Sequence, residues 1–467
     1  MQKLFITLLS AITIVNFVNA QDSDFKPSGN LSGYVFGDYY YMGHADSLGR
    51  GAGNVQYKPY STTSTLLIPS TGTPVLGYKG NDSIVKLGSA NKNLLGSGLQ
   101  NKAKSNAFQI RRVYISYDYN FAPKFTASAT LADEQNLDAG GNNTVYLKYA
   151  YLKWADIFPM INLIIGQQPT PSFATTPFGT EPLWGYRSIE RTIMDIHNID
   201  ASSDLGVALQ GDVWRGFSGD SLKPNLVGYM LQIGNGSSAK PENDGYKTMR
   251  YTIYSSLMQQ KLTFGFYGDY KTTALGTVNQ SATTFKGYAN FKTKKFKIGG
   301  EIFFQNWKNG ATLSTNAYQD INIMGWSVFT SGKIIQDLNF FARLDMFNPD
   351  TKYNKNDIYT KVAPASIIQP SWSSPTSATL TPYTLANDAI SQSAIFSTQT
   401  FVTAGFDYTP VKRFHIMPNI WYTQFNSMVN LPSTAKLAKS DYDLVYRVTF
   451  YYIFNSSKSV NNNGMDN

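Results

Sequence analysis

The chain of 467 residues contains no cysteine, only three histidines and few charged residues. The absence of cysteine excludes disulfides, thiolate chemistry, Cys-ligated metals and lipid attachment at an N-terminal cysteine. Charged residues make up 15% of the chain, well below the ~25% of typical soluble proteins. Aromatic residues, in contrast, reach 14%. This composition favours a protein with a large surface that cannot carry charge.

Long apolar runs and interdomain linkers are also absent. No stretch beyond residue 20 approaches the ~20 apolar residues that a membrane helix requires. Residues 1–20 combine Lys3, a short interrupted apolar run and a small-residue site at Ala20, which predicts a signal peptide. We therefore expect residues 21–454 to form a single domain, followed by a polar tail at 455–467.

The charge balance of the exported chain is basic. Without Lys3, 39 basic residues face 31 acidic ones, a net charge of +8. The basic residues are scattered and form no stripe, so no nucleic-acid partner is expected. The balance weakly favours anionic partners.

Apolar and polar residues alternate along many stretches of the chain. In "DLVYRVTFYYIF" (443–454), Tyr446, Val448 and Phe450 share one face with other apolar residues, while Arg447 and Thr449 lie on the opposite face. Side chains of a strand point to alternate faces. The pattern predicts lipid against Val448 and water against Thr449.

Alternation of this kind recurs and predicts sixteen strands. They are expected at 29–41, 106–121, 123–134, 143–154, 160–168, 203–214, 222–234, 247–258, 260–271, 282–293, 295–306, 320–332, 336–348, 398–410, 412–426 and 441–454. Connections after even strands are short, and those after odd strands are longer, with about 64 residues after the first and about 49 after the thirteenth. This predicts a transmembrane up-and-down antiparallel β-barrel with periplasmic turns, extracellular loops and a water-filled lumen, in the outer membrane of a Gram-negative bacterium.

Two stretches resemble known families. The last strand resembles the aromatic-terminated strand that outer-membrane proteins present to their assembly machinery. The stretch 165–213 resembles the phosphate-selective porin (O and P) family, through Gly166, Gln167, Pro169, Trp184, Arg187, Ser188, Arg191, Ser202, Asp204 and Gly206. The resemblance implies an outer-membrane porin, a homotrimer, and small hydrophilic or anionic solutes. The family name implies phosphate, but many members are unspecialised channels, so it identifies no solute.

The third long connection, 169–202, matches in position the loop that trimeric porins fold into the barrel. We expect Trp184 and Tyr186 to anchor this loop to the wall. The predicted constriction charges are Glu181, Arg187, Glu190, Arg191 and Asp195. The alternative is a solvated surface loop whose charges have no particular role.

Three arginines, Arg112, Arg343 and Arg447, fall on lumen-facing positions of their strands and predict a basic wall opposite this loop. The alternative is that lumen carboxylates neutralise them, with Asp118, Asp345, Asp407 and Asp443 as candidates.

No enzymatic motif frames any of the three histidines, so neither catalysis nor a cofactor nor a metal is expected. A passive porin with weak anion preference is the preferred hypothesis. The alternative is an adhesin or receptor that uses a silent barrel as an anchor for its long loops.

Overall fold

The computed structural model describes residues 25–46, 50, 66–69, 78–79, 83–84, 91–94, 103–134, 143–173, 180–189, 191–242, 245–275, 278–362, 395–430 and 439–455. The predicted signal peptide, Glu190, the side chain of Glu181 and all but the first residue of the polar tail lie outside this part of the chain. Among the described residues, no helix is both long enough and apolar enough to cross a membrane.

Within the described residues, sixteen strands close into an antiparallel barrel. They are β1 (Ser28–His44), β6 (Asn106–Ala122), β7 (Phe125–Asp133), β8 (Tyr146–Phe158), β9 (Ile161–Pro169), β10 (Ser203–Gly216), β11 (Asn225–Gly234), β12 (Thr248–Leu257), β13 (Leu262–Leu275), β14 (Val278–Lys292), β15 (Phe296–Leu313), β16 (Tyr318–Ile335), β17 (Leu338–Asn348), β19 (Ser397–Val411), β20 (Phe414–Ser427) and β21 (Ser440–Asn455). Closure occurs at β1, where Tyr39 pairs with Phe108 of β6 on one side and Val448 of β21 on the other. The predicted barrel is confirmed.

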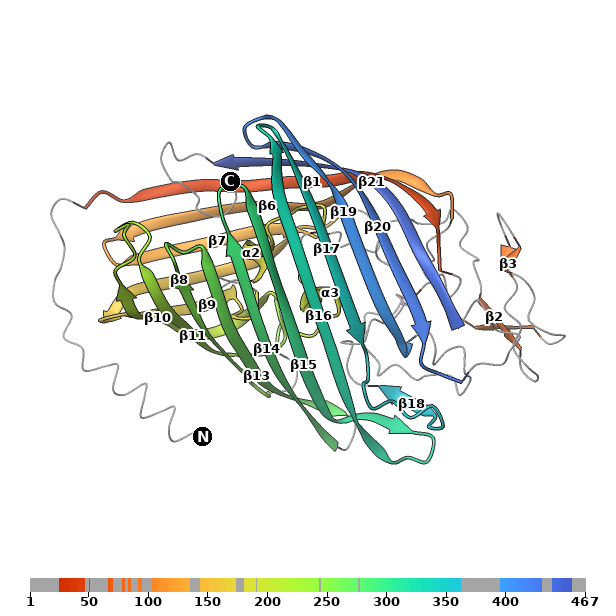
Figure 1. Cartoon of the computed structure of the whole chain (residues 1–467). Helices are drawn as coiled ribbons and strands as arrows, with labels where there is room; N and C mark the ends of the chain where they lie inside the picture. The colour runs from red at the N-terminus through yellow and green to blue at the C-terminus, as the bar shows by residue number, and fades with distance from the viewer. Residues whose placement is uncertain are drawn as a thin grey trace.

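The remaining strands are short and lie at one end of the barrel. β2 (Leu66–Pro69) pairs with β5 (Asn91–Leu94), β3 (Tyr78–Lys79) with β4 (Ser83–Ile84), and β18 (Tyr359–Val362) with the end of β15. Figure 1 shows β2, β3 and β18 at the same end, away from the tight turn that joins β19 to β20. Loops thus gather at one mouth and turns at the other, as predicted.

Two predicted loops proved to be largely strand. The β13–β14 connection is reduced to residues 276–277, and β15 runs seven residues beyond its predicted end. Asn309-Gly310 has the sequence of a hairpin turn. Here Asn309 takes a φ of 55° inside a bulge, where the pairing with β16 passes from Trp307 directly to Ala311. Trp307 and Ala311 are both fully buried, and this burial carries the strand onward.

The alternation predicted for the last strand is present in the barrel. Tyr446, Val448 and Tyr452 of β21 are 43–50% exposed on the outer surface. Arg447 and Thr449 point inward and are buried. Water was expected beside Thr449, but its hydroxyl donates instead to Asp38 at 2.5 Å. The outer apolar face leaves the lipid-facing assignment intact.

Adjacent residues of β6 give a test of this register. Ile115 is 44% exposed on the outer face, whereas Ser116 is half-buried and faces the lumen. Ile115→Arg places a charge in hydrocarbon at a cost of ~2–4 kcal/mol, so the yield of heat-modifiable folded barrel should fall sharply. Ser116→Arg is the matched control and should fold, because its charge meets water. Equal folding yields on a semi-native gel would show that the register is wrong.

Candidate pore constriction

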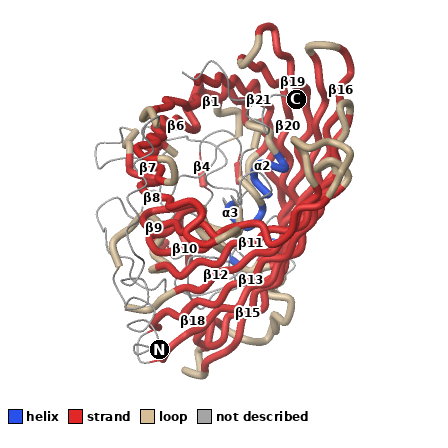
Figure 2. The backbone as a smooth tube through the Cα atoms, turned by 90° about the vertical axis from the view of Figure 1, so that its left-hand side faces the viewer, coloured by secondary structure: helices blue, strands red, loops and turns tan. Residues whose placement is uncertain are grey.

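The described residues of the connection between β9 and β10 contact inward-pointing side chains of the wall. We refer to residues 170–202 as the inner loop. It carries two short helices, α2 (Thr180–Trp184) and α3 (Ile193–Ile196), which contact β15 and β16 respectively. In Figure 2 both helices lie within the ring of strands, across from β7 and β8.

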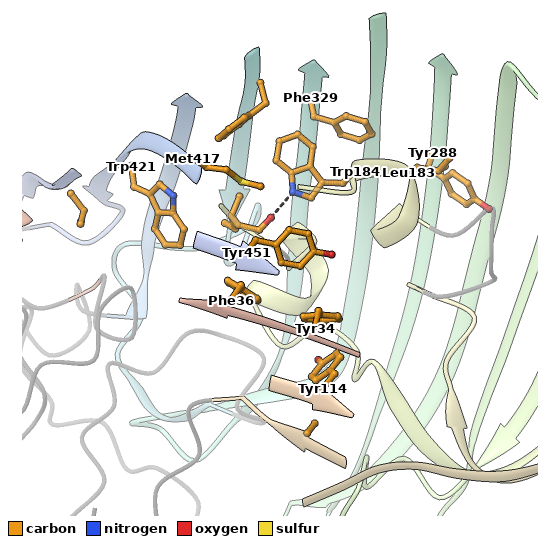
Figure 3. Packing of buried hydrophobic residues seen from close by; sticks show 14 of the residues in the cluster. Tyr34, Phe36, Tyr114, Leu183, Trp184, Tyr288, Phe329, Met417, Trp421 and Tyr451 are labelled. Atoms are coloured by element: carbon orange, nitrogen blue, oxygen red, sulfur yellow. Dashed lines mark hydrogen bonds between the residues drawn. The ribbon is translucent and has the colours of Figure 1, made fainter. Parts of the chain in front are cut away.

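Two aromatic side chains of the inner loop pack on rings of the wall. The Trp184 ring lies edge-on to Phe329 of β16, with 5.2 Å between centroids (Figure 3). The Tyr186 ring stacks on Phe341 of β17 at 4.7 Å. Trp184 is fully buried, and its indole Nε1 donates to the Ile189 carbonyl oxygen at 2.5 Å. Ring pairs contribute ~0.5–1.5 kcal/mol each beyond the burial of their area, so these two rings hold the end of α2 and the residues after it against β16 and β17.

Local sequence explains helix α3. Thr192 caps its start, because the threonine Oγ1 accepts the amide hydrogen of Asp195 at 3.4 Å. Ile193 and Met194 are completely buried in an apolar cluster with residues of β13 to β17. Asp195 lies in the first turn, near the positive end of the helix dipole. Because the apolar pair faces the wall, the Asp195 side chain points toward the lumen.

A buried carboxylate, Asp200, joins both ends of the inner loop to the wall. Arg250 of β12 donates to it, with 2.8 Å between Nη2 and Oδ1. Tyr267 of β13 and Ser172, near the start of the loop, each donate at 2.9 Å. Arg250 also reaches Asp204 through Nη1 at 2.7 Å. Burial alone raises the pKa of Asp200, but Arg250 outweighs burial and lowers it, so the loop stem rests on a charged, paired carboxylate.

Residues of the family-like motif surround this stem. Gly166 has a φ of 125°, and a Cβ at this position would lie 2.3 Å from the Ala150 carbonyl oxygen. A Cβ on Gly206 would lie 2.1 Å from the carbonyl oxygen of Ile233. Both sites therefore require glycine, and Asp204 between them takes part in the Arg250 network. These three residues of the motif are explained by the way the loop leaves and rejoins the sheet.

The predicted loop charges reach two different parts of the wall. The Arg187 guanidinium lies over the ring of Tyr34 on β1, 4.5 Å from its centroid. Arg191 lies 3.7 Å from Asp195, measured from Nε to Oδ2. Asp195 in turn lies 3.8 Å from Arg112 of β6. The structure thus brings Arg191, Asp195 and Arg112 together, and Arg187 lies over Tyr34 of the neighbouring strand β1.

Two of the three predicted wall arginines are neutralised at close range. Arg447 Nη1 lies 2.6 Å from Asp38 Oδ2, and its guanidinium lies 3.8 Å from the Trp421 ring centroid. Arg343 forms a two-pronged pair with Asp345, at 2.8 Å from Nε and 2.7 Å from Nη2. Asp345 was predicted from the sequence as a neutralising carboxylate. Asp38, the single acidic residue of β1, was not predicted.

Sequence reasoning also missed Arg111. The pairing of β6 with β1 skips this residue, so the bulge turns both Arg111 and Arg112 toward the lumen. Arg111 Nη1 lies 3.3 Å from Asp38, and its guanidinium lies 4.7 Å from the Trp421 ring centroid. Strict alternation places Arg111 on lipid, and the two adjacent arginines in "QIRRVY" were the available signal of a bulge.

A third group of charges surrounds Glu134, at the end of β7. Lys148 of β8 and the hydroxyl of Tyr114 both donate to it, and Tyr146 donates at 2.5 Å. Arg112 Nη1 lies 3.6 Å away. Burial opposes ionisation of Glu134, but Arg112 and Lys148 together hold its pKa well below the ordinary value. The cluster is continuous with Asp195 through Arg112.

The histidines occupy structural positions. His44 lies 2.8 Å from Asp441, and His415 lies 2.9 Å from Asp407, at opposite ends of the barrel. In the described part of the chain, no group of three or more His, Asp or Glu side chains could hold a metal ion.

His197, at the end of α3 in the inner loop, is buried against β17. Its ring stacks on Phe347 with 3.5 Å between centroids and an angle of 4°. Burial, and secondarily the charge of Arg343, lowers the pKa of His197 to about 3. The packing therefore requires a neutral imidazole.

Solved structures with a similar chain path are bacterial outer-membrane proteins. The outer-membrane channel DcaP of Acinetobacter baumannii matches with a TM-score of 0.54 and 10% identity, over 92% of this chain and 97% of that one. The barrel has the porin fold. An anion-selective porin from Comamonas acidovorans (TM-score 0.48, 11% identity, 92% and 100% covered) and OmpT of Vibrio cholerae (0.47, 8%, 92% and 99%) are similar at lower scores.

No protein-family model matches the chain, and no curated protein matches it by sequence. The resemblance to the phosphate-selective porins therefore stays a prediction.

The Asp200 network gives a test of loop attachment. Arg250→Met keeps the length of the side chain but leaves Asp200 and Asp204 buried without their cation. Removing one partner of a buried pair costs ~3–5 kcal/mol, and release of the loop relieves that cost. We expect single-channel conductance to rise and to become heterogeneous. Arg215→Met is the control, because that arginine is largely exposed and its pair with Asp212 contributes little. Unchanged conductance in Arg250→Met would show that the network does not hold the loop.

Low pH should also weaken the attachment of the inner loop, through His197. The pKa of His197 is depressed to about 3 in the folded protein. Below the ordinary histidine pKa of ~6.5, the unfolded chain therefore binds a proton at this imidazole that the folded protein does not bind. Each pH unit from there down to about 3 costs about 1.4 kcal/mol. The apparent Tm should fall from pH 6.5 to pH 4 in wild type and less steeply in His197→Gln. Parallel slopes for the two proteins would exclude His197 as the cause.

Proposed function

We propose that this protein is an outer-membrane porin, a water-filled channel for passive diffusion of small hydrophilic solutes. One observation carries the proposal: the inner loop is bonded inside a barrel of sixteen strands, at Trp184 and Asp200, and brings charged side chains into the lumen. A barrel of this size leaves an aqueous lumen. A silent anchor for an adhesin has no need of a loop held at this depth.

The proposed setting is the outer membrane of a Gram-negative bacterium. The apolar outer face, with Val448 and Tyr452 exposed on the last strand, fits contact with lipid. β21 closes the barrel by pairing with β1 as far as Asn455. A homotrimer and recognition of the last strand by the assembly machinery, both implied by the sequence resemblance, belong to this proposal.

A weak anion preference is the proposed selectivity. In the charge cluster around Asp38, Glu134, Asp195 and Asp345, which does not include the Asp200 network at the loop stem, basic groups outnumber acidic ones. The basic residues are Arg111, Arg112, Lys148, Arg187, Arg191, Arg343 and Arg447, and the acidic ones are Asp38, Glu134, Asp195 and Asp345. Glu181 and Glu190 on the same loop oppose this excess. Fixed cationic groups favour anions where a channel is narrow.

Tight phosphate binding is not part of the proposal. Strong phosphate capture uses guanidinium groups that offer two parallel N–H bonds. Arg343 already gives such a pair of bonds to Asp345, and Arg447 is paired with Asp38. The chemistry of these arginines therefore supports a broad field and not a dedicated phosphate cradle.

Planar-bilayer recording of the purified protein tests this function. We expect stepwise conductance and, under a potassium chloride gradient, a reversal potential displaced modestly toward that of chloride. The displacement should shrink at high salt, because the Debye length falls from ~8 Å at physiological salt to ~3 Å at 1 M. Correctly folded protein that inserts without conductance would support the anchor hypothesis, and a cation preference would refute the selectivity.

A further inference from the structure

The tight turns at one end of the barrel carry more than half of the net charge of the exported chain. The seven turns are residues 123–124, 159–160, 217–224, 258–261, 293–295, 336–337 and 412–413. Their acidic residues are Asp220 and Asp337, and their basic residues are Lys124, Lys223, Lys261, Lys294, Lys295, Lys412 and Arg413. The turns therefore hold a charge of +5, out of +8 for the whole exported chain.

Neighbouring turns between β10 and β17 join most of these charges into one row. The side-chain Nε2 of Gln260 donates to a carbonyl oxygen of the 217–224 turn at 3.4 Å. The amide hydrogen of Lys292 is donated to the Lys261 carbonyl oxygen at 2.8 Å. The amide of Lys333 forms the same bond with Lys295, also at 2.8 Å. We refer to the exposed lysines of this row as the lysine rim, which consists of Lys223, Lys261, Lys294, Lys295 and Lys333.

The lysine rim has no acidic partner in the described part of the chain. None of its five ammonium groups forms an ion pair with a described carboxylate. Asp220, in the same turn as Lys223, accepts the amide hydrogen of Leu222 at Oδ1, at 2.9 Å. Lys297 is not part of the rim, because its Nζ donates to the Trp184 carbonyl oxygen of the inner loop at 3.4 Å. The charge of the rim is therefore open to an anion from outside the protein.

Exposed apolar side chains lie next to the rim lysines in the sequence. Leu222 precedes Lys223 and is 88% exposed, and Phe217 in the same turn is 92% exposed. Phe296, also exposed, directly follows Lys295. At a membrane surface an apolar side chain enters the acyl region, while a neighbouring lysine extends its ammonium to the head groups. Because the rim lies where the lipid-facing strands end, its lysines lie at the depth of the head groups.

We propose that the lysine rim binds anionic phospholipid in the leaflet at the turn end of the barrel, which is the periplasmic leaflet in the proposed orientation. Phosphatidylglycerol has the required charge, whereas the ammonium of phosphatidylethanolamine neutralises its own phosphate. Clustered basic residues beside a membrane attract anionic lipid in this way. The inference goes beyond the channel function and does not depend on it, because a barrel without conductance would bind the same lipid.

Quenching of tryptophan fluorescence by brominated lipid measures this preference. Trp214 lies near the end of β10 and is 47% exposed, so the signal that Trp214→Phe removes reports the lipid beside the rim. In vesicles that mix phosphatidylethanolamine with phosphatidylglycerol, one of the two brominated, we expect the wild type to favour phosphatidylglycerol roughly fivefold. This factor corresponds to the ~1 kcal/mol of one lysine near an anionic surface. Salt at 1 M should abolish the preference, because the Debye length falls to ~3 Å.

Two variants of equal charge locate the interaction. The turn variant replaces the five rim lysines, as Lys223→Gln, Lys261→Gln, Lys294→Gln, Lys295→Gln and Lys333→Gln, and should bind the two lipids about equally. The control variant removes the same charge from exposed positions at the loop end and should keep the wild-type preference. Its substitutions are Lys240→Gln, Lys308→Gln, Lys352→Gln, Lys355→Gln and Lys439→Gln. All ten positions are exposed, so both variants should fold, which a semi-native gel verifies.

A preference that persists in the turn variant, or that both variants lose, would overturn the assignment to the lysine rim. Equal binding of the two lipids by the wild type would overturn the lipid proposal and favour an acidic protein as the partner of the rim. Conductance tests the channel function separately, so the two proposals fail in different ways.

Discussion

Backbone hydrogen bonding in hydrocarbon is the constraint on which the rest of this structure depends. Each unpaired N–H or C=O group in lipid costs several kcal/mol, so a sheet can cross the membrane only if it closes. β1 meets this requirement by pairing with both β6 and β21. Closure of sixteen strands in turn encloses a lumen too wide for wall side chains alone to fill. The inner loop, with its apolar helices and its bonded stem, occupies part of that space.

The loop is held by two kinds of interaction with opposite energetics. Burial of Trp184, Ile193 and Met194 stabilises it by the hydrophobic effect, at ~1.5–3 kcal/mol for each large side chain. The Arg250–Asp200 pair contributes less net energy, because desolvation of two charges offsets most of their attraction. What the pair adds is a defined position, since any displacement leaves a buried charge without its partner. Apolar packing therefore stabilises the loop, and the ion network specifies where it lies.

The fold could be predicted from the sequence because lipid and water impose period-two alternation on every strand. Predicted strand ends lie within four residues of the observed ones, apart from the end of β15. The site was less accessible to prediction, because side chains that pair inside the barrel can be separated by long stretches of chain. Asp38 and Arg447 are 409 residues apart, and only closure of the barrel brings them together. Arg111 was missed for a different reason, since a bulge breaks the alternation on which its assignment rests.

The placement of charge within the lumen follows from these same constraints. Where the loop packs on β16, β17 and β1, water is excluded, and a cation can stay only with an acidic partner, as Arg343 does with Asp345. The side chains of Arg191 and Asp195 are partly exposed, so water solvates their charges and full pairing is not required. In the proposed channel, solvated charges act on passing ions, whereas desolvated pairs hold the loop in place. The side of the lumen that the loop leaves unpacked therefore determines which charges a solute meets.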